Sequence, residues 1–119
     1  MEGDGDPAVL HVGAYDAAGR LVACGNTRPD LPPFPCAQSD AAWRVRGMAT
    51  ADDVRGRGAG AAVLAALLGL SRERGGRLLW CNARTPAQAF YERAGLRTWG
   101  EPWLDPAIGP HVVMWTRLD

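Results

Sequence analysis

The chain has 119 residues, of which 47% are apolar and 22% are charged, proportions typical of one globular domain. Thirteen basic and thirteen acidic residues leave no formal net charge, which argues against a general nucleic-acid binder. Because every basic residue is an arginine, catalysis through a lysine Schiff base is excluded.

The N-terminus and the cysteines predict a cytoplasmic protein of one domain. The first seven residues are acidic and glycine-rich, unlike a secretory signal, so we expect a flexible tail over 1–7 and a single domain over 8–119. The longest apolar run, residues 59–70, is too short to cross a bilayer, and no membrane partner is expected. Neither a disulfide framework nor a metal site is expected from three widely spaced cysteines, Cys24, Cys36 and Cys81.

The first half of the chain predicts three strands. Residues 8–15 and 20–27 are β-prone runs joined by an Asp-Ala-Ala-Gly turn, which predicts a hairpin. Four prolines between residues 29 and 35 forbid regular structure, so a loop is expected to about residue 40. Loops of this length often serve binding. Residues 42–50 predict the third strand.

The second half begins with a predicted helix, strand and helix. Residues 61–74 place apolar side chains at helical spacing, and a Gly-Gly pair ends this helix. An apolar run over 77–82 predicts a buried strand. Residues 85–88 combine a capping box with proline at the first helical position, which predicts a second helix up to residue 94.

Two more strands, 96–99 and 111–116, complete the order β-β-β-α-β-α-β-β, with a proline-containing loop between them. The helix between the third and fourth strands implies a right-handed crossover and parallel pairing there. The first two strands form an antiparallel hairpin. The sequence therefore predicts an α/β (α+β) fold with a mixed, mostly antiparallel sheet and two helices.

Glycines alternate with other residues where the third strand leads into the first helix. Without Cβ atoms, the backbone at Gly56, Gly58 and Gly60 can turn tightly and bring N–H groups close to a ligand. The positive end of the helix and the flanking Arg55 and Arg57 favour an anion, so a phosphate or pyrophosphate site is predicted. The alternative is a flexible loop that binds no ligand.

Two known phosphate motifs fit this loop poorly. A Walker A loop ends in Gly-Lys-Ser/Thr, and the chain has no lysine. A dinucleotide fingerprint is formally present from Gly56 to Ala61, but residues 51–55 separate it from its strand. The next strand ends in Cys81 and Asn82 rather than in a carboxylate, so a Rossmann fold is not expected.

Two segments resemble the signature of the GCN5-related N-acetyltransferases (GNAT). The first spans residues 48–60 and matches the family's Arg/Gln-x-x-Gly-x-Gly/Ala pattern at Arg55, Gly58 and Gly60. The second spans residues 82–96 and has the family's asparagine, Phe-Tyr pair and glycine, with leucine in place of the usual final phenylalanine: Asn82, Phe90, Tyr91, Gly95 and Leu96. The resemblance covers residues 8–118 and implies the GNAT fold.

The resemblance also implies a role for individual residues toward acetyl-CoA. A strand segment would pair through its backbone with the pantetheine arm: Met48, Ala49 and Thr50. Backbone N–H groups of the glycine loop would hold the pyrophosphate: Arg55, Gly56, Arg57, Gly58, Ala59 and Gly60. Asn82 would lie beside the pantetheine or thioester, and Tyr91 near the sulfur as a general acid for the departing thiolate.

The sequence departs from the family at the acceptor side. Family members usually begin with a strand and two helices that form one wall of the acceptor site, whereas here the hairpin starts near residue 8. Many relatives carry a glutamate base where this chain has Arg44 and Arg46, which suit an acidic acceptor or, equally, charge partners at an interface. His111 is the candidate base, since an imidazole changes charge near neutral pH; the alternative is a structural histidine.

These observations give two hypotheses about function. In the first, the chain transfers the acetyl group of acetyl-CoA to an amine of a small molecule or peptide by direct attack in a ternary complex. In the second, it is a non-catalytic acyl-CoA-binding or dimeric interaction module. We also expect a homodimer, because sheet surface that the N-terminal helices cover in relatives would otherwise stay exposed.

Overall fold

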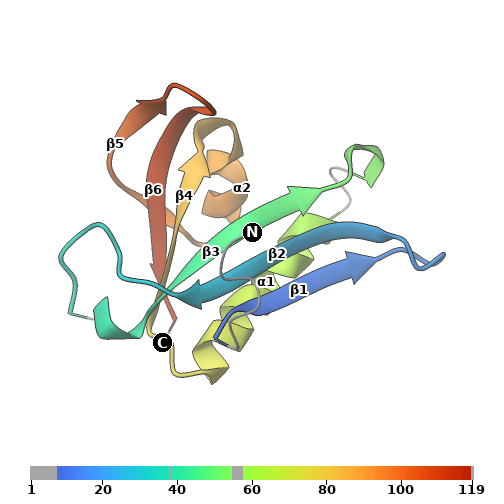
Figure 1. The fold of residues 1–119 in the computed structure, drawn as a ribbon, viewed down its shortest axis with the longest axis horizontal. Coiled ribbons are helices and arrows are strands. Elements are labelled where there is room, and N and C mark those ends of the chain that lie inside the picture. Colours follow the sequence, from blue (N-terminus) through green and yellow to red (C-terminus); the bar gives the residue numbers. More distant parts are fainter. Residues whose placement is uncertain (1–7, 38, 55–57, 119) are drawn as a thin grey trace.

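The protein forms one six-stranded sheet with two helices, shown in Figure 1. The structure, a computed structural model, describes residues 8–37, 39–54 and 58–118, so the predicted tail lies outside the described residues. In chain order the elements are β1 (Leu10–Tyr15), β2 (Leu21–Pro29), β3 (Ala42–Thr50), α1 (Ala59–Glu73), β4 (Leu78–Arg84), α2 (Gln88–Arg93), β5 (Arg97–Asp105) and β6 (Gly109–Arg117). The predicted order is confirmed.

The strands lie in the order β1-β2-β3-β4-β6-β5. Among the strand pairs of the described residues, only the β3–β4 pair is parallel, and the other four pairs are antiparallel. The parallel pair is the one joined through α1, as a crossover connection requires. The predicted mixed, mostly antiparallel sheet is therefore confirmed.

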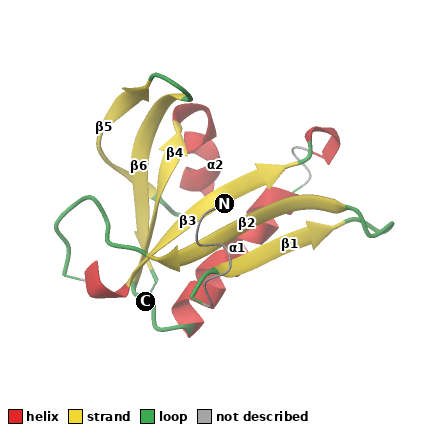
Figure 2. Ribbon diagram, viewed as in Figure 1, coloured by secondary structure: helices red, strands yellow, loops and turns green. Residues whose placement is uncertain are grey.

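The parallel strands separate soon after they begin. Their pairing runs from Ala42–Leu78 to Arg44–Trp80 and extends no further in the described chain. Beyond this point β3 continues to Thr50 beside β2, while β4 continues to Arg84 beside β6. Figure 2 shows the two strands diverging, which divides the sheet into two halves and opens a gap between them.

A β-bulge redirects the side chains of β3 within the separated segment. Two steps along β2, from Cys24 to Asn26, face three steps along β3, from Ala49 to Arg46. Gly47 lies at the bulge with φ +65°, a conformation that favours glycine. The strand had been predicted without this irregularity.

Both helices contribute to one hydrophobic core on the same face of the sheet. Apolar side chains of α1 pack against alternate residues of the strands: Val63, Leu64 and Leu67 against Ala23, Val45, Leu79, Cys81, Val112 and Met114. Tyr91 of α2 belongs to the same cluster. Within 8–37, 39–54 and 58–118, no helix is long and apolar enough to cross a membrane.

The proline-rich segment after β2 covers part of the other face. Its Phe34 is buried in a second cluster with Trp80 and Val113. The Phe34 ring lies 5.2 Å from that of Trp99 and 6.1 Å from that of Trp115, measured between centroids. The predicted loop start at residue 29 is wrong, since Pro29 still pairs with β3. The segment therefore packs against the sheet. The role in binding that its length suggests stays a prediction.

Strand β5 and helix α2 differ locally from the prediction. The strand had been predicted to end at residue 99, but it continues past Pro102 to residue 105. A register shift and Gly100, at φ +71°, accommodate the proline on this edge strand. The predicted capping box is wrong, because Thr85–Ala87 forms a 3₁₀ turn and no side chain caps it or α2.

Candidate functional site

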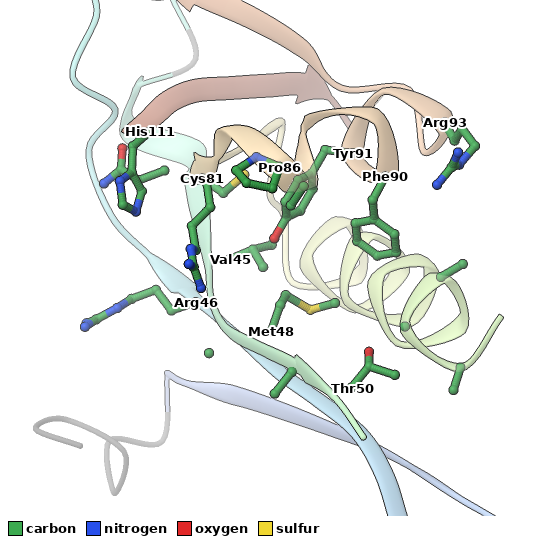
Figure 3. Close-up of a pocket in the computed structure, with 18 of the residues that line it drawn as sticks. Val45, Arg46, Met48, Thr50, Cys81, Pro86, Phe90, Tyr91, Arg93 and His111 are labelled. Carbon is green, nitrogen blue, oxygen red and sulfur yellow. The ribbon is translucent and has the colours of Figure 1, made fainter. Parts of the chain in front are cut away.

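A cleft of about 950 Å³ occupies the gap between the separated ends of β3 and β4. It is lined by the end of β3, the first turn of α1, the end of β4, the segment from Pro86 to α2, and the start of β6. Figure 3 shows labelled side chains from each of these elements except α1 around the cleft. Strand divergence, rather than a long loop, thus creates the space.

The first turn of α1 forms one end of the cleft. Gly58 precedes the helix with φ +86° and leaves open space where a side chain would stand. The first internal bond of the helix joins the Ala62 N–H to the Gly58 carbonyl at 2.9 Å, and among the described residues no side chain caps the earlier N–H groups. These N–H groups and the helix dipole can together hold an anion.

The end of β3 packs tightly against this turn. A Cβ atom on Gly60 would lie only 2.9 Å from Thr50 Oγ1, so the helix can approach the strand only with glycine there. Met48 packs against the core beneath α1, over Gly25, whose missing side chain makes room for the Met48 sulfur. Because β3 has left β4 here, its backbone edge toward the cleft is available to pair with an extended ligand.

Tyr91 lies in the cleft on the same side as α1. Its ring is buried and meets the Phe90 ring edge to face, with centroids 5.1 Å apart. Burial raises the pKa of the Tyr91 hydroxyl, and the neighbouring Cys81 adds to the rise. Burial also raises the pKa of Cys81 to about 12, against the opposing charge of Arg44. Both groups therefore stay protonated at neutral pH, which suits Tyr91 to donate a hydrogen bond and makes Cys81 unreactive.

His111 lies in the cleft at the start of β6 with a defined tautomer. Its Nδ1 is 2.8 Å from the carbonyl oxygen of Gly109, which can only accept, so Nδ1 carries the proton. In the neutral ring, Nε2 is then the nitrogen with the lone pair. Trp103 stacks on the imidazole with centroids 5.6 Å apart, and only 5% of His111 is exposed. The hydrogen bond and the stacking together hold the ring in one orientation.

The cleft connects the two faces of the sheet. Val45, Cys81 and Val112 belong to the core beneath α1, so the alternate side chains of these strands project from the other face. Those that line the cleft from that face are Arg46, Asn82, Arg84 and His111. A reactant can therefore enter from the α1 side and meet a second reactant that enters from the opposite side.

Nine of the predicted site residues line this one cleft: Met48, Ala49, Thr50, Gly58, Ala59, Gly60, Asn82, Tyr91 and His111. Arg55, Gly56 and Arg57, also predicted to bind the cofactor, lie outside the described residues. Sequence reasoning missed Arg84, Phe90 and Arg93 as lining residues. The sequence does not show that Arg84 is a neighbour of His111, because the pairing of β4 with β6 brings the two residues together.

A family model and a relative agree with this geometry. The model of the Acetyltransferase (GNAT) family matches residues 2–96. The chain belongs to the GNAT family. One relative, an uncharacterized N-acetyltransferase (YitI) of Bacillus subtilis strain 168, is 35% identical over 110 residues, which are 92% of this chain and 71% of the relative. The resemblance inferred from the two motifs is thereby confirmed.

Solved structures show the same GNAT fold. An aminoglycoside 6'-N-acetyltransferase in complex with coenzyme A superposes with a TM-score of 0.76 at 15% identity, covering 96% of this chain and 75% of that one. A GCN5-related N-acetyltransferase from Kribbella flavida gives a TM-score of 0.75 at 24% identity, covering 95% and 70% of the two chains. At these identities the likeness concerns the fold alone.

Proposed function

We propose that this GNAT protein transfers an acetyl group from acetyl-CoA to an amine in a ternary complex. The observation that carries the proposal is the cleft between β3 and β4, which joins the N-terminal turn of α1 to Tyr91 and to the oriented imidazole of His111. An anion site, a donor and a base in one cleft are what this reaction needs.

Acetyl-CoA would bind on the α1 side of the cleft. The N–H groups after Gly58 would hold the pyrophosphate, and Arg55–Arg57 remain part of this proposal. The backbone of Met48, Ala49 and Thr50 would pair with the amides of the pantetheine arm, with Asn82 near its end. The free strand edge and the open space at Gly58 support this assignment.

The acceptor amine would approach from the opposite face, where His111 lies. His111 Nε2 removes a proton from the ammonium form of the acceptor, and the neutral nitrogen then attacks the thioester carbonyl carbon. The N–C bond forms and the C–S bond breaks. Tyr91 donates its proton to the departing thiolate and regains one from the newly formed amide nitrogen, which loses its extra proton as the intermediate collapses. Backbone N–H groups beside the cleft can polarise the carbonyl meanwhile.

Incubation of the purified protein with acetyl-CoA and a panel of amines tests the proposal, with the free thiol of coenzyme A as the readout. We expect amine-dependent release of thiol and a mass gain of one acetyl group on the amine. Binding of acetyl-CoA without transfer to any amine would instead favour the alternative function, an acyl-CoA-binding module. That alternative is weakened by the defined His111 tautomer, which binding alone does not require.

Tyr91→Phe is expected to lower kcat by about 100-fold while the affinity for coenzyme A changes little, because only the proton donor is removed. The phenyl ring keeps the packing against Phe90. Tyr15→Phe is the matched control, since Tyr15 is exposed on β1 and does not line the cleft. Equal kcat values for Tyr91→Phe and the parent protein would exclude Tyr91 as the acid.

We also propose a homodimer that acts in the cytoplasm. Edge strand β5 and the turn after it expose Trp99, Trp103, Leu104 and Ile108, which a second copy would bury. Sedimentation at micromolar concentration is expected to give a species of twice 12.7 kDa, and a monomer alone would contradict the proposal. The three unbridged cysteines support the reducing location.

A further inference from the structure

Arginines gather on the sheet face opposite α1, around the end of the cleft where His111 lies. Arg44 and Arg46 flank Val45, whose side chain packs beneath α1, so both arginines project from the other face. Arg84 pairs in register with His111 and shares that face. Figure 3 shows Arg46 and His111 on the side of β3 away from α1.

These positive charges have little compensation from the protein. Arg46 and Arg84 both line the cleft, and neither forms an ion pair with any residue in the described part of the chain. Arg44, next to Arg46 on the same face, has one ion pair, in which its Nη1 lies 3.4 Å from a carboxylate oxygen of Asp30. A positive field therefore extends over the entrance next to His111.

Arg44 is held in a fixed orientation with a donor left over. Its guanidinium stacks on the Trp80 ring, 5.0 Å from the centroid. Trp80 is anchored in turn by a 3.0 Å hydrogen bond from its Nε1 to the Asp30 carbonyl oxygen. Within the described residues, the buried Nε of Arg44 has no hydrogen-bond partner. Arg44 does not line the cleft, so its fixed positive charge acts on a ligand in the cleft through the electric field rather than by direct contact.

We propose that the acceptor is an amine that also carries a carboxylate, which Arg46 and Arg84 bind and which the field of Arg44 favours; this inference rests on the proposed acetyl transfer. The amine has to reach His111, and the surrounding guanidinium groups would repel an acceptor with only an ammonium charge. A carboxylate reverses that interaction and can form charge-assisted hydrogen bonds with arginine. The same positive charges lower the pKa of the bound ammonium and favour its nucleophilic form.

Matched pairs of amines test the inference. β-Alanine and β-alaninamide differ only in the carboxylate, and tetrapeptide amides that begin with aspartate or asparagine extend the comparison from small amines to peptides. For at least one pair, we expect kcat/KM for the acidic member to exceed that for the neutral member by about tenfold or more. A charged hydrogen bond contributes enough binding free energy for a difference of this size. Saturation-transfer NMR of each pair with the coenzyme A-bound protein measures acceptor binding independently of turnover.

Variants locate the effect. Arg46→Gln and Arg84→Gln are expected to remove most of the preference for the carboxylate, and Arg46→Lys to retain part of it. Arg97→Gln is the control, since Arg97 stacks on Trp115, 4.9 Å from its ring centroid, and lies outside the cleft. The inference would be contradicted if Arg97→Gln lost the preference for the acidic amine. It would also be contradicted if Arg46→Gln lowered kcat/KM equally for the acidic and the neutral amine of a pair.

The two proposals fail in different ways. Transfer to acidic and neutral amines at equal kcat/KM would overturn the carboxylate inference and leave acetyl transfer standing. Selective binding of the acidic members without acetylation would support the carboxylate site and overturn the proposed enzymatic function. If neither member of any pair binds or reacts at millimolar concentration, the carboxylate site is wrong.

Discussion

Gly58→Val is expected to lower the affinity for coenzyme A by about 100-fold or more. The backbone at Gly58 has φ +86°, and Gly58 and the first turn of α1 line the cleft. A branched side chain disfavours this conformation and fills the open space where the pyrophosphate would lie. Loss of two charge-assisted hydrogen bonds corresponds to about 100-fold or more in affinity, measurable by isothermal titration calorimetry.

Gly75→Val separates the binding effect from backbone strain. Gly75 follows α1 with φ +88°, and no atom lies within 4 Å of where its Cβ would be. Both substitutions impose a left-handed conformation on valine, at a cost of about 1–2 kcal/mol in the free energy of unfolding. Thermal denaturation should therefore shift for both variants, whereas coenzyme A affinity should fall only for Gly58→Val. An unchanged affinity in Gly58→Val would overturn the anion site.

His111→Gln is expected to lower kcat by about 100-fold or more, the usual contribution of a general base. The glutamine amide can still donate a hydrogen bond to the Gly109 carbonyl, so the turn at the start of β6 should be retained. Coenzyme A affinity should change little, because His111 projects from the face opposite α1.

His11→Gln is the matched control for this experiment. His11 lies exposed on β1, outside the cleft, so its replacement should leave both kcat and the affinity for coenzyme A unchanged. Activity of His111→Gln within twofold of the parent protein would assign His111 a structural role, which is the alternative that the sequence left open.

The fold could be predicted because its elements are encoded locally. The bounds of β3 agree with the predicted strand, and α1 begins two residues before the predicted helix. The prediction failed at β5, because the residues after 99 are expected to form a proline-containing loop, whereas the strand continues to residue 105. An edge strand tolerates proline because one side of its backbone has no partner, and edge position is a property of the whole sheet.

The two halves of the candidate site differed in how far the sequence could predict them. The half facing α1 comes from continuous segments, so the resemblance to the GNAT motifs pointed to several of its lining residues: Met48, Ala49, Thr50, Gly58, Ala59 and Gly60. The opposite half depends on register across β4, β6 and β5, which brings Arg84 and Trp103 beside His111. Sequence spacing does not determine such pairings, because they depend on which strands become neighbours. Gly47 within a predicted strand was the one local indication of the bulge.

The bulge in β3 has a consequence for how this protein could diversify. Val45, Met48 and Thr50 line the cleft on the side of α1, whereas Arg46 lines it from the opposite face. Because one short strand contributes to both sides of the cleft, a substitution at position 46 changes the chemistry of one side and leaves the other side intact. Under the proposed function, evolution or engineering can thus change the acceptor without rebuilding the side that would bind acetyl-CoA.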